Sequence, residues 1–559
     1  MQARSAWPKR CDVATLLFVM VLALASGACR DRGGSAGGAS GEPQQGGTAV
    51  IGMRTDLAGF NSITYSDQYT GELINYALFT PLIQYDADLE PQPYLAESWE
   101  MTGDTGIVFR IRQGVNWHDG QPVTARDVKF TFDMAKDPAT ASLLGSAFLG
   151  YVDRAEVVDD YTIRFHFSQP HAQALESFWW APMPEHLLGD IAPAELRNAE
   201  FNRSPVGSGP YRFVEWEANQ RITLERNPAF PESMGGPPHL DRIVFRIIPE
   251  PSTMLTELVA GNVMVDIPLL PEQSRQIERD ESLELFAFPG RTFYYIGWNT
   301  RREPFTDPRV RRALTLGMDR QEVIDALLFG HGQTAVGPIP QWSPLFPEDI
   351  EPLPYDTAAA SALLEQAGWV DRNADGVREN AAGQPLQFTM LSSDNPLSRS
   401  VVEVVQAQLR EIGVQVEARV LEFQTLLGRH RGRDFDAVFS AWVMDNFQIA
   451  SAPMSLFHSR FADVEGSANR SSYANPRADD LIERAAASTD AEESRELWAE
   501  FLRIMQEEQP FTFMFWFEEL AAARISVGGI EMDQRGEFVT LADWWVAGAT
   551  TEQGVASNE

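Results

Sequence analysis

The sequence predicts an α/β protein that contains more than one sheet. After residue 47, segments with helical spacing of apolar residues alternate with short strand-like segments, and there is no internal repeat. A chain of 559 residues is too long for one compact core, because single cores stop growing at about 250–300 residues. The hydrophobic content of 44% and the charged content of 22% are those of a folded globular protein. We therefore expect two or more lobes.

Strands are expected where apolar residues form a short run or alternate with polar residues. They are expected at 47–54, 107–112, 162–167, 221–226, 242–248, 415–420 and 435–439. Helices are expected where apolar residues recur every three or four positions. They are expected at 67–78, 124–132, 308–329, 398–412 and 492–508. Thr124 should cap the second of these helices, because Asp127 follows three residues later, as in a capping box.

The charge balance argues against a nucleic-acid partner. The chain has 45 Lys+Arg against 79 Asp+Glu, a net charge of −34, whereas binding to phosphates requires a basic face. No loop ending in Gly-Lys-Ser/Thr is present, which argues against an NTPase built on that loop. The two cysteines, Cys11 and Cys29, are too few for a disulfide scaffold or a cysteine-built metal cluster.

The N-terminus has the features of a secretory signal. Arg4, Lys9 and Arg10 precede an apolar run at 13–25, which is shorter than the ~20 residues that span a bilayer. Cys29 follows Ser26-Gly27-Ala28, and this segment resembles a bacterial lipobox, in which the cysteine is acylated and becomes the new N-terminus. A plain cleaved signal is the alternative. We expect a signal peptide at 1–28, a flexible tether that cannot pack at 29–46, and a body in the periplasm or cell envelope that is anchored by lipid at Cys29.

Several short blocks occur in a characteristic order. The first includes His118-Asp-Gly120 and the helix start Thr124-Ala-Arg-Asp-Val128, and the second includes Gly207-Ser-Gly-Pro-Tyr211. The later blocks lie at 305–314 with 318–320, at 363–369, and at 475–482. Together they resemble the extracytoplasmic solute-binding proteins of peptide and oligopeptide ABC importers, family 5, over nearly the whole mature chain.

The resemblance implies a type II periplasmic-binding fold with two ligand lobes joined by a hinge. Lobe I would comprise 47–80, 206–292 and 515–559, an extra domain would be inserted at 81–205, and lobe II would be 293–514. It also implies a non-catalytic, monomeric receptor without a cofactor. Such a receptor captures a peptide or similar small solute between the lobes and delivers it to an ABC permease and ATPase complex.

The predicted ligand site rests on Trp442-Val-Met-Asp445, after the expected strand at 435–439. In the family this Trp-x-x-Asp holds the α-amino group of bound peptides, so the resemblance assigns Asp445 as the amine anchor. A desolvated carboxylate binds an ammonium strongly, and Trp442 would supply a flat apolar wall. The alternative is a core tryptophan and a loop aspartate that caps a turn. The residues after Asp445 lack the acidic-aromatic and proline run of many oligopeptide binders, which leaves another cationic or amine-bearing ligand open.

Other candidate sites are weaker. The stretch 371–379 resembles the start of a calcium loop, but position twelve is Ala382, so a turn explains it better and no metal site is expected. The aromatic runs at 178–180, 293–295, 511–517 and 544–545 fit either the core or a ligand cleft. A secreted hydrolase that uses cleft carboxylates is the second function considered. Only the abundance of Asp and Glu suggests it.

Overall fold

The structure is a computed structural model that describes residues 42–549, except 66, 170–173, 445–447 and 489. Its largest feature is an 11-stranded mixed sheet, with the order β15-β14-β16-β12-β17-β11-β1-β10-β9-β8 and β13 paired to β17. These strands are β15 (Gln415–Leu421), β14 (Gln387–Ser393), β16 (Ala437–Val443), β12 (Leu283–Trp298), β17 (Phe511–Arg524), β11 (Val265–Ile267), β1 (Thr48–Met53), β10 (Arg242–Ile247), β9 (Arg221–Arg226), β8 (Tyr211–Glu217) and β13 (Gly332–Thr334). β1 pairs in parallel with β10 and β11, and β14 with β15 and β16, while the other pairs are antiparallel. The predicted α/β class is confirmed.

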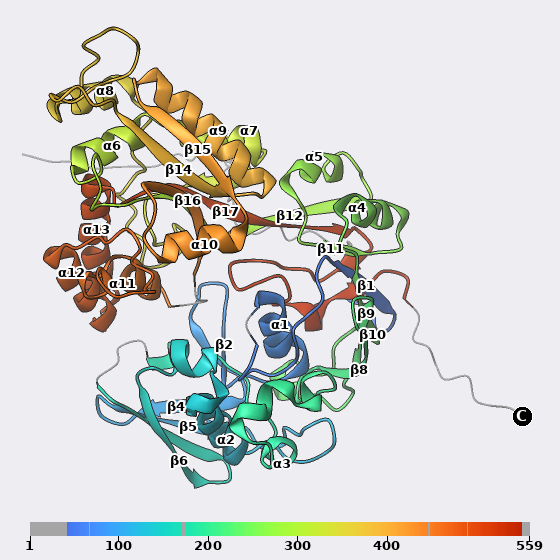
Figure 1. Cartoon of the computed structure of the whole chain (residues 1–559). Helices are drawn as coiled ribbons and strands as arrows, with labels where there is room; N and C mark the ends of the chain where they lie inside the picture. The colour runs from blue at the N-terminus through green and yellow to red at the C-terminus, as the bar shows by residue number, and fades with distance from the viewer. Residues whose placement is uncertain (1–41, 66, 170–173, 445–447, 489, 550–559) are drawn as a thin grey trace, which may run out of the picture.

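Two long antiparallel strands, β12 and β17, connect the two halves of this sheet. β11, β1, β10, β9 and β8 lie on one side of the pair, and β16, β14 and β15 on the other. Figure 1 shows β12 and β17 running across the molecule from the side of β14 and β16 toward β11 and β1. Their pairing shifts register between Pro289 and Phe293 and again between Tyr294 and Tyr295. Such irregularities bend a strand locally.

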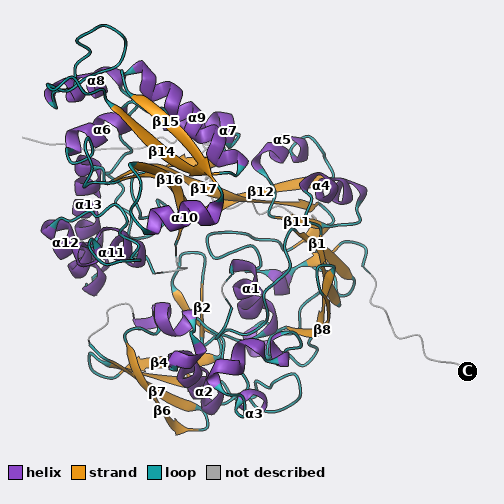
Figure 2. Cartoon of the chain, in the orientation of Figure 1, coloured by secondary structure: helices purple, strands orange, loops and turns teal. Residues whose placement is uncertain are grey.

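A separate four-stranded sheet, with the order β4-β5-β7-β6, lies at the bottom of Figures 1 and 2. Its strands are β4 (Ala96–Met101), β5 (Gly106–Ile111), β7 (Thr162–Phe167) and β6 (Val152–Asp159). α2 (Ala125–Lys136) packs on it, and the short α3 (Glu185–Leu188) packs against α2. Two-stranded pairs complete the set, namely β2 (Ile83–Tyr85) with β3 (Pro91–Pro93) and β18 (Val527–Gly528) with β19 (Trp545–Val546).

Helices surround the second half of the large sheet. They are α6 (Pro308–Leu316), α7 (Arg320–Leu327), α8 (Thr357–Gln366), α9 (Pro396–Glu411), α10 (Phe423–Arg431), α11 (Ser451–Phe457), α12 (Pro476–Ala487) and α13 (Ala491–Glu508). α9 and α10 cover opposite faces, because Phe388 of β14 packs in a cluster with α9 whereas Leu391 packs with Leu426 of α10. The first half carries α1 (Gln68–Leu73), α4 (Pro251–Ala260) and α5 (Ser274–Ile277).

Most expected elements are present, and two need correction. The capping box is confirmed, with Thr124 as the N-cap of α2 and Asp127 bonded back to it. The helix expected at 308–329 is two helices, because α6 ends at Leu316 and Asp319 caps α7 by accepting the Glu322 N–H. The strand expected at 435–439 begins at Ala437 and continues to Val443, so Trp442 lies inside it.

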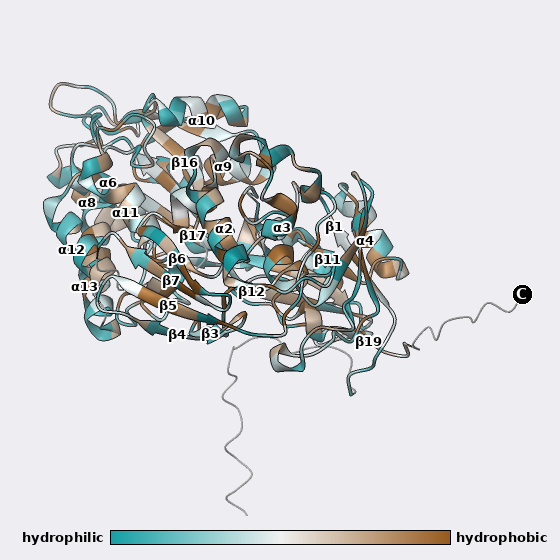
Figure 3. Ribbon diagram, turned by 90° about the horizontal axis from the view of Figure 1, so that it is seen from below, coloured by the Kyte–Doolittle hydropathy of each residue, from teal (hydrophilic) through white to brown (hydrophobic). Residues whose placement is uncertain are grey.

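Apolar side chains fill separate cores on the faces of these sheets. Figure 3 shows apolar residues concentrated along the strands and polar residues on the outer helices. Most aromatic residues of the four runs are core, including Phe178, Phe293, Tyr295 and Trp544, whose exposed fractions are 0–2%.

The end of the expected tether packs on the body, contrary to the prediction for 29–46. Gly46 donates its N–H to the carbonyl oxygen of His239, and Gln44 accepts a hydrogen bond from the Gly548 N–H at 2.8 Å. The segment is therefore fixed by its own polar groups. Within the part of the chain that the structure describes, no helix combines the length and apolar character that crossing a membrane requires.

Candidate ligand-binding site

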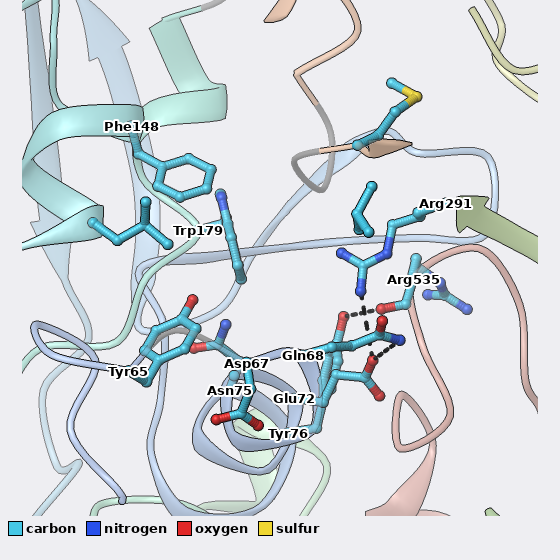
Figure 4. A pocket seen from close by; sticks show the side chains of 14 residues that line it. Tyr65, Asp67, Gln68, Glu72, Asn75, Tyr76, Phe148, Trp179, Arg291 and Arg535 are labelled. Carbon is cyan, nitrogen blue, oxygen red and sulfur yellow. Dashed lines mark hydrogen bonds and ion pairs between the residues drawn. The ribbon is translucent and has the colours of Figure 1, made fainter. Parts of the chain in front are cut away.

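A pocket of about 140 Å³ lies where segments from both halves of the large sheet and from the separate four-stranded unit meet. Its walls come from α1, the turn after it, the segments around Phe148 and Trp179, Arg291 of β12, the end of β16 and Arg535 (Figure 4). Val443 and Met444 represent the second half of the sheet. The pocket therefore lies where the two halves face each other beside the β12–β17 connection.

The lower wall is the helix at 68–78. Asp67 begins it by accepting the Thr70 N–H on Oδ1 at 2.9 Å, so it is an ordinary aspartate N-cap. After Leu73 the helix widens into a π turn at Ile74–Leu78, closed by the Phe79 N–H to the Ile74 carbonyl. Single π turns often occur at functional sites. Gln68, Glu72, Asn75 and Tyr76 of this helix all line the pocket.

Glu72 is the buried carboxylate of this wall. Its Oε2 accepts the backbone N–H groups of Glu537 and Phe538 at 2.8 and 3.3 Å. Its Oε1 accepts from Gln68 Nε2 at 3.0 Å and lies 3.8 Å from Arg291 Nη2. Burial raises the pKa of Glu72 well above its usual range, and the nearby charge of Glu537 raises it further, whereas Arg291 opposes the shift.

Arg291 lies beside a cluster of carboxylates and lowers the pKa of Glu72 and of Glu519. Besides Glu72, the charges of Glu519 and Glu537 lie in the same cluster, and Gln68 Nε2 also donates to Glu537 Oε2 at 3.2 Å. Burial raises the pKa of Glu519 to about 7, and Glu537 adds to that shift while Arg291 lowers it. Because burial raises the pKa of Glu72 and of Glu519, this cluster carries less negative charge than its number of carboxylates suggests.

The other guanidinium of the pocket is already neutralised. Arg535 forms a two-point pair with Asp533, with Nη2–Oδ2 at 2.6 Å and Nε–Oδ1 at 3.0 Å, and it donates to the carbonyl oxygen of Tyr85. A bidentate pair of this kind fixes both groups. Arg535 therefore contributes shape to the pocket and little free positive charge.

Of the two residues predicted for ligand binding, the structure describes Trp442 but not Asp445. Trp442 is half-buried on β16, opposite Phe293, and packs in a cluster with Phe293 and Tyr295. It is not among the described residues that line the pocket, whereas the next two residues, Val443 and Met444, are. Asp445 lies outside the described residues, as does Cys29.

The stretch interpreted as a turn rather than a calcium loop brings three carboxylates together. Oxygen atoms of Asp371, Asp375 and Glu379 lie within 4.8 Å of one another. They already accept hydrogen bonds from the turn itself, since Asp371 accepts the Ala374 and Gly376 N–H groups and Glu379 accepts the Arg372 N–H. The turn geometry therefore accounts for the arrangement.

Sequence reasoning missed most of the pocket. One signal in the sequence could have indicated it, namely a polar stripe on an otherwise apolar helix. This stripe consists of Gln68, Glu72, Asn75 and Tyr76. Trp179 belongs to the aromatic run at 178–180, for which both a core and a cleft position were considered. It lines the pocket. Arg291 and Arg535 lie far apart in the sequence and gave no local signal.

The sequence is similar to known bacterial proteins along most of its length. The sequence profile described as bacterial extracellular solute-binding proteins, family 5 Middle, matches residues 90–463, which is more than half of the chain. The oligopeptide-binding protein AppA of Bacillus subtilis is 30% identical over 547 residues, with 95% of this chain and 98% of that protein covered. The chain belongs to family 5 of the bacterial extracellular solute-binding proteins. The dipeptide-binding protein of Escherichia coli is 26% identical and covers 86% of this chain and 91% of its own length.

Solved structures of other proteins agree with the fold. The structure of AppA from Bacillus subtilis in complex with a nonapeptide has a TM-score of 0.72 and 29% identity, and it covers 90% of this chain and 100% of that one. The substrate-binding protein CtaP from Listeria monocytogenes, at 24% identity, has a TM-score of 0.78 and covers 90% of this chain and 100% of its own. The type II periplasmic-binding fold predicted from the resemblance is confirmed.

The family membership also decides between the two functions considered. Family 5 proteins are extracytoplasmic solute receptors of ABC importers and not enzymes, so the receptor interpretation is confirmed. The hydrolase alternative has no support in the family. The chain is therefore an extracytoplasmic receptor that works with an ABC permease and its ATPase.

Proposed function

We propose that this receptor captures a peptide between the two halves of the large sheet and delivers it to the permease. The observation that carries the proposal is the pocket beside β12 and β17, whose walls come from both halves. Support comes from AppA of Bacillus subtilis, a relative along nearly the whole chain whose structure was solved with a nonapeptide. A pocket of about 140 Å³ holds little more than one side chain, so a peptide requires its walls to separate and then close.

We further propose that Asp445 anchors the ligand's α-amino group, with Trp442 as a supporting wall. Val443 and Met444, the two residues before Asp445, line the pocket, which supports this role. Truncating one partner of a desolvated charge pair costs about 2–5 kcal/mol, which is more than tenfold in affinity.

The test is isothermal titration of a peptide and of its Nα-acetylated form. We expect acetylation and Asp445→Asn each to weaken binding more than tenfold, and acetylation to have little further effect on the Asp445→Asn variant. Asp463→Asn is the control, because Asp463 is an exposed carboxylate paired with Arg301. Equal binding of free and acetylated peptides to the native protein would exclude the anchor, and failure of all peptides would exclude the peptide function.

The proposed lobes keep the boundaries expected from the sequence, with lobe I at 47–80, 206–292 and 515–559, the extra domain at 81–205 and lobe II at 293–514. The separate four-stranded sheet and the long β12–β17 connection support this division. We expect peptide addition to reduce the radius of gyration in small-angle scattering. Tight binding with an unchanged radius would contradict closure of the lobes.

We also propose that the mature protein is a monomer tethered through an acylated Cys29. The signal-like run at 13–25 and the small residues before Cys29 support the anchor. Expressed with its signal in a bacterial host, the protein should partition into detergent, whereas Cys29→Ser should remain in the aqueous phase. Equal partitioning of the two forms would exclude acylation. Light scattering of the Cys29→Ser form should give the mass of one chain.

A further inference from the structure

Two oxygen acceptors in the pocket have no donor among the described residues. Asn75 is only 4% exposed, yet its Oδ1 has no hydrogen-bond partner. Asp67 uses Oδ1 to cap the helix, and its buried Oδ2 is likewise without a partner. Both residues line the same pocket. Because buried acceptors without donors are costly and uncommon, two in one pocket indicate that a bound molecule supplies N–H or O–H groups.

The charged residues around the pocket indicate whether that molecule carries a positive or a negative charge. Asp67 and Glu72 line it, and Glu519 and Glu537 belong to the carboxylate cluster behind Glu72. Among the described pocket residues, Arg291 lies in this cluster and Arg535 is paired with Asp533. Burial raises the pKa of Glu72 and of Glu519, so the negative charge next to the two acceptors is that of Asp67, for which no ion pair is found among the described residues. This disfavours an anionic ligand group and favours a cationic one.

The acceptors lie at the aromatic end of the pocket. Figure 4 shows Tyr65, Asp67, Asn75, Phe148 and Trp179 on one side, and Arg291, Arg535, Gln68, Glu72 and Tyr76 on the other. Phe148 and Trp179 pack edge to face at 5.6 Å between ring centroids. Aromatic rings attract a cation through their faces, and they also pack against the methylene groups of a long basic side chain.

The size of the pocket limits what it accepts. About 140 Å³ is close to the ~150 Å³ cavity that holds one benzene ring. A single lysine-type or arginine-type side chain matches this size, and its ammonium or guanidinium group offers only donors. Such a group offers the donors that Asn75 Oδ1 and Asp67 Oδ2 lack among the described residues.

We propose that this pocket is a subsite for a basic side chain of the bound peptide, with Asp67 and Asn75 as its acceptors. The subsite would take a side chain, whereas the α-amino group is assigned to Asp445, and it rests on the proposed peptide function. It makes the receptor selective for peptides that carry lysine or arginine at one position.

The test compares peptides that are identical except at one position, which holds lysine, Nε-acetyl-lysine or norleucine, by isothermal titration at pH 7. The substitution is scanned along the peptide, and the native protein should prefer lysine at one position by about tenfold or more. Asp67→Asn keeps an oxygen that can cap the helix and removes the charge. It should abolish most of this preference, so that the lysine and norleucine peptides bind within about twofold of each other.

Asp356→Asn is the matched control. Asp356 caps α8 by accepting the Ala359 N–H three residues on, as Asp67 does with Thr70, but it lies outside the pocket. This control should bind all three peptides as the native protein does. A second variant, Asn75→Leu, should also reduce the preference for lysine. Asn75 Oδ1 has no hydrogen-bond partner among the described residues, so its removal costs the ligand-free protein no hydrogen bond. The loss of this atom should therefore not lower the melting temperature.

Equal affinity for lysine and norleucine at every position would overturn the subsite while leaving the peptide function intact. An Asp67→Asn variant that weakens both peptides equally would also overturn it, because that result means a general effect on the cleft. If none of the peptides binds, the peptide function fails, and the subsite fails with it.

Discussion

Glu72 is the buried carboxylate that ties α1 to the C-terminal segment and to β12. Glu72→Leu removes the acceptor of two backbone N–H groups, those of Glu537 and Phe538, and the partner of Arg291. A buried donor left without an acceptor costs about 1–3 kcal/mol. With two such donors left without an acceptor, we expect the free energy of unfolding to fall by about 2–6 kcal/mol.

Glu72→Gln separates the charge from the hydrogen bonds. Its carbonyl oxygen can still accept both backbone N–H groups, while its amide group faces Gln68 and Arg291, which are also donors. Because burial already raises the pKa of Glu72, loss of its charge matters little, and we expect a smaller cost of about 1–2 kcal/mol.

The assay is urea unfolding of ligand-free protein at pH 7, followed by tryptophan fluorescence and far-UV circular dichroism. Glu365→Leu is the control, since Glu365 of α8 has a side chain 60% exposed and a long ion pair with Arg378; its loss should cost less than about 0.5 kcal/mol. Equal costs for Glu72→Gln and Glu72→Leu, or a neutral Glu72→Leu, would refute the hydrogen-bonding role.

Three further changes test the structure through stability. Burial raises the pKa of Glu519 to about 7, above its unfolded value of 4.5, so the folded protein should lose stability as pH rises from about 4.5 to 7. Glu519→Gln should therefore stabilise the protein by up to about 3 kcal/mol at pH 8 and by little at pH 4, as read from melting temperatures. A stabilisation that does not depend on pH would contradict this. Burial also raises the pKa of Asp266 to about 7, and neither of its oxygens has a partner among the described residues, so Asp266→Asn should raise the melting temperature at pH 8 and lose that benefit at pH 4. Thr124→Ala removes one side of the capping box and should cost about 1 kcal/mol in urea unfolding, and a neutral result would mean that Asp127 alone holds the helix start.

Local patterns were enough to predict most of the strands and helices. β7 and β9 have the bounds that alternation predicts, and the cap of α2 follows from Thr124 and Asp127. The break between α6 and α7 was missed because the apolar spacing continues across it. The decisive feature is the polar side chain of Asp319, which starts a new helix.

The pocket could be predicted only in part, because it is made by long-range contacts. Glu72 and Asn75 lie on one stripe of a helix, so a polar stripe was visible in the sequence. Arg291 lies on β12 and Arg535 on the C-terminal segment, and the fold brings both to the pocket. No local sequence pattern encodes this long-range contact. The assignment of Asp445 came from the family resemblance and stays a prediction.

Capture of a peptide is the central claim, and native mass spectrometry of the mature protein isolated from a bacterial envelope tests it most directly. The folded protein should carry one noncovalent adduct per chain, and denaturation should release molecules that fragment as peptides, enriched in lysine or arginine. A nonpeptide molecule as the sole adduct would contradict the claim. An empty protein that gains no mass from a mixture of peptides would contradict it equally.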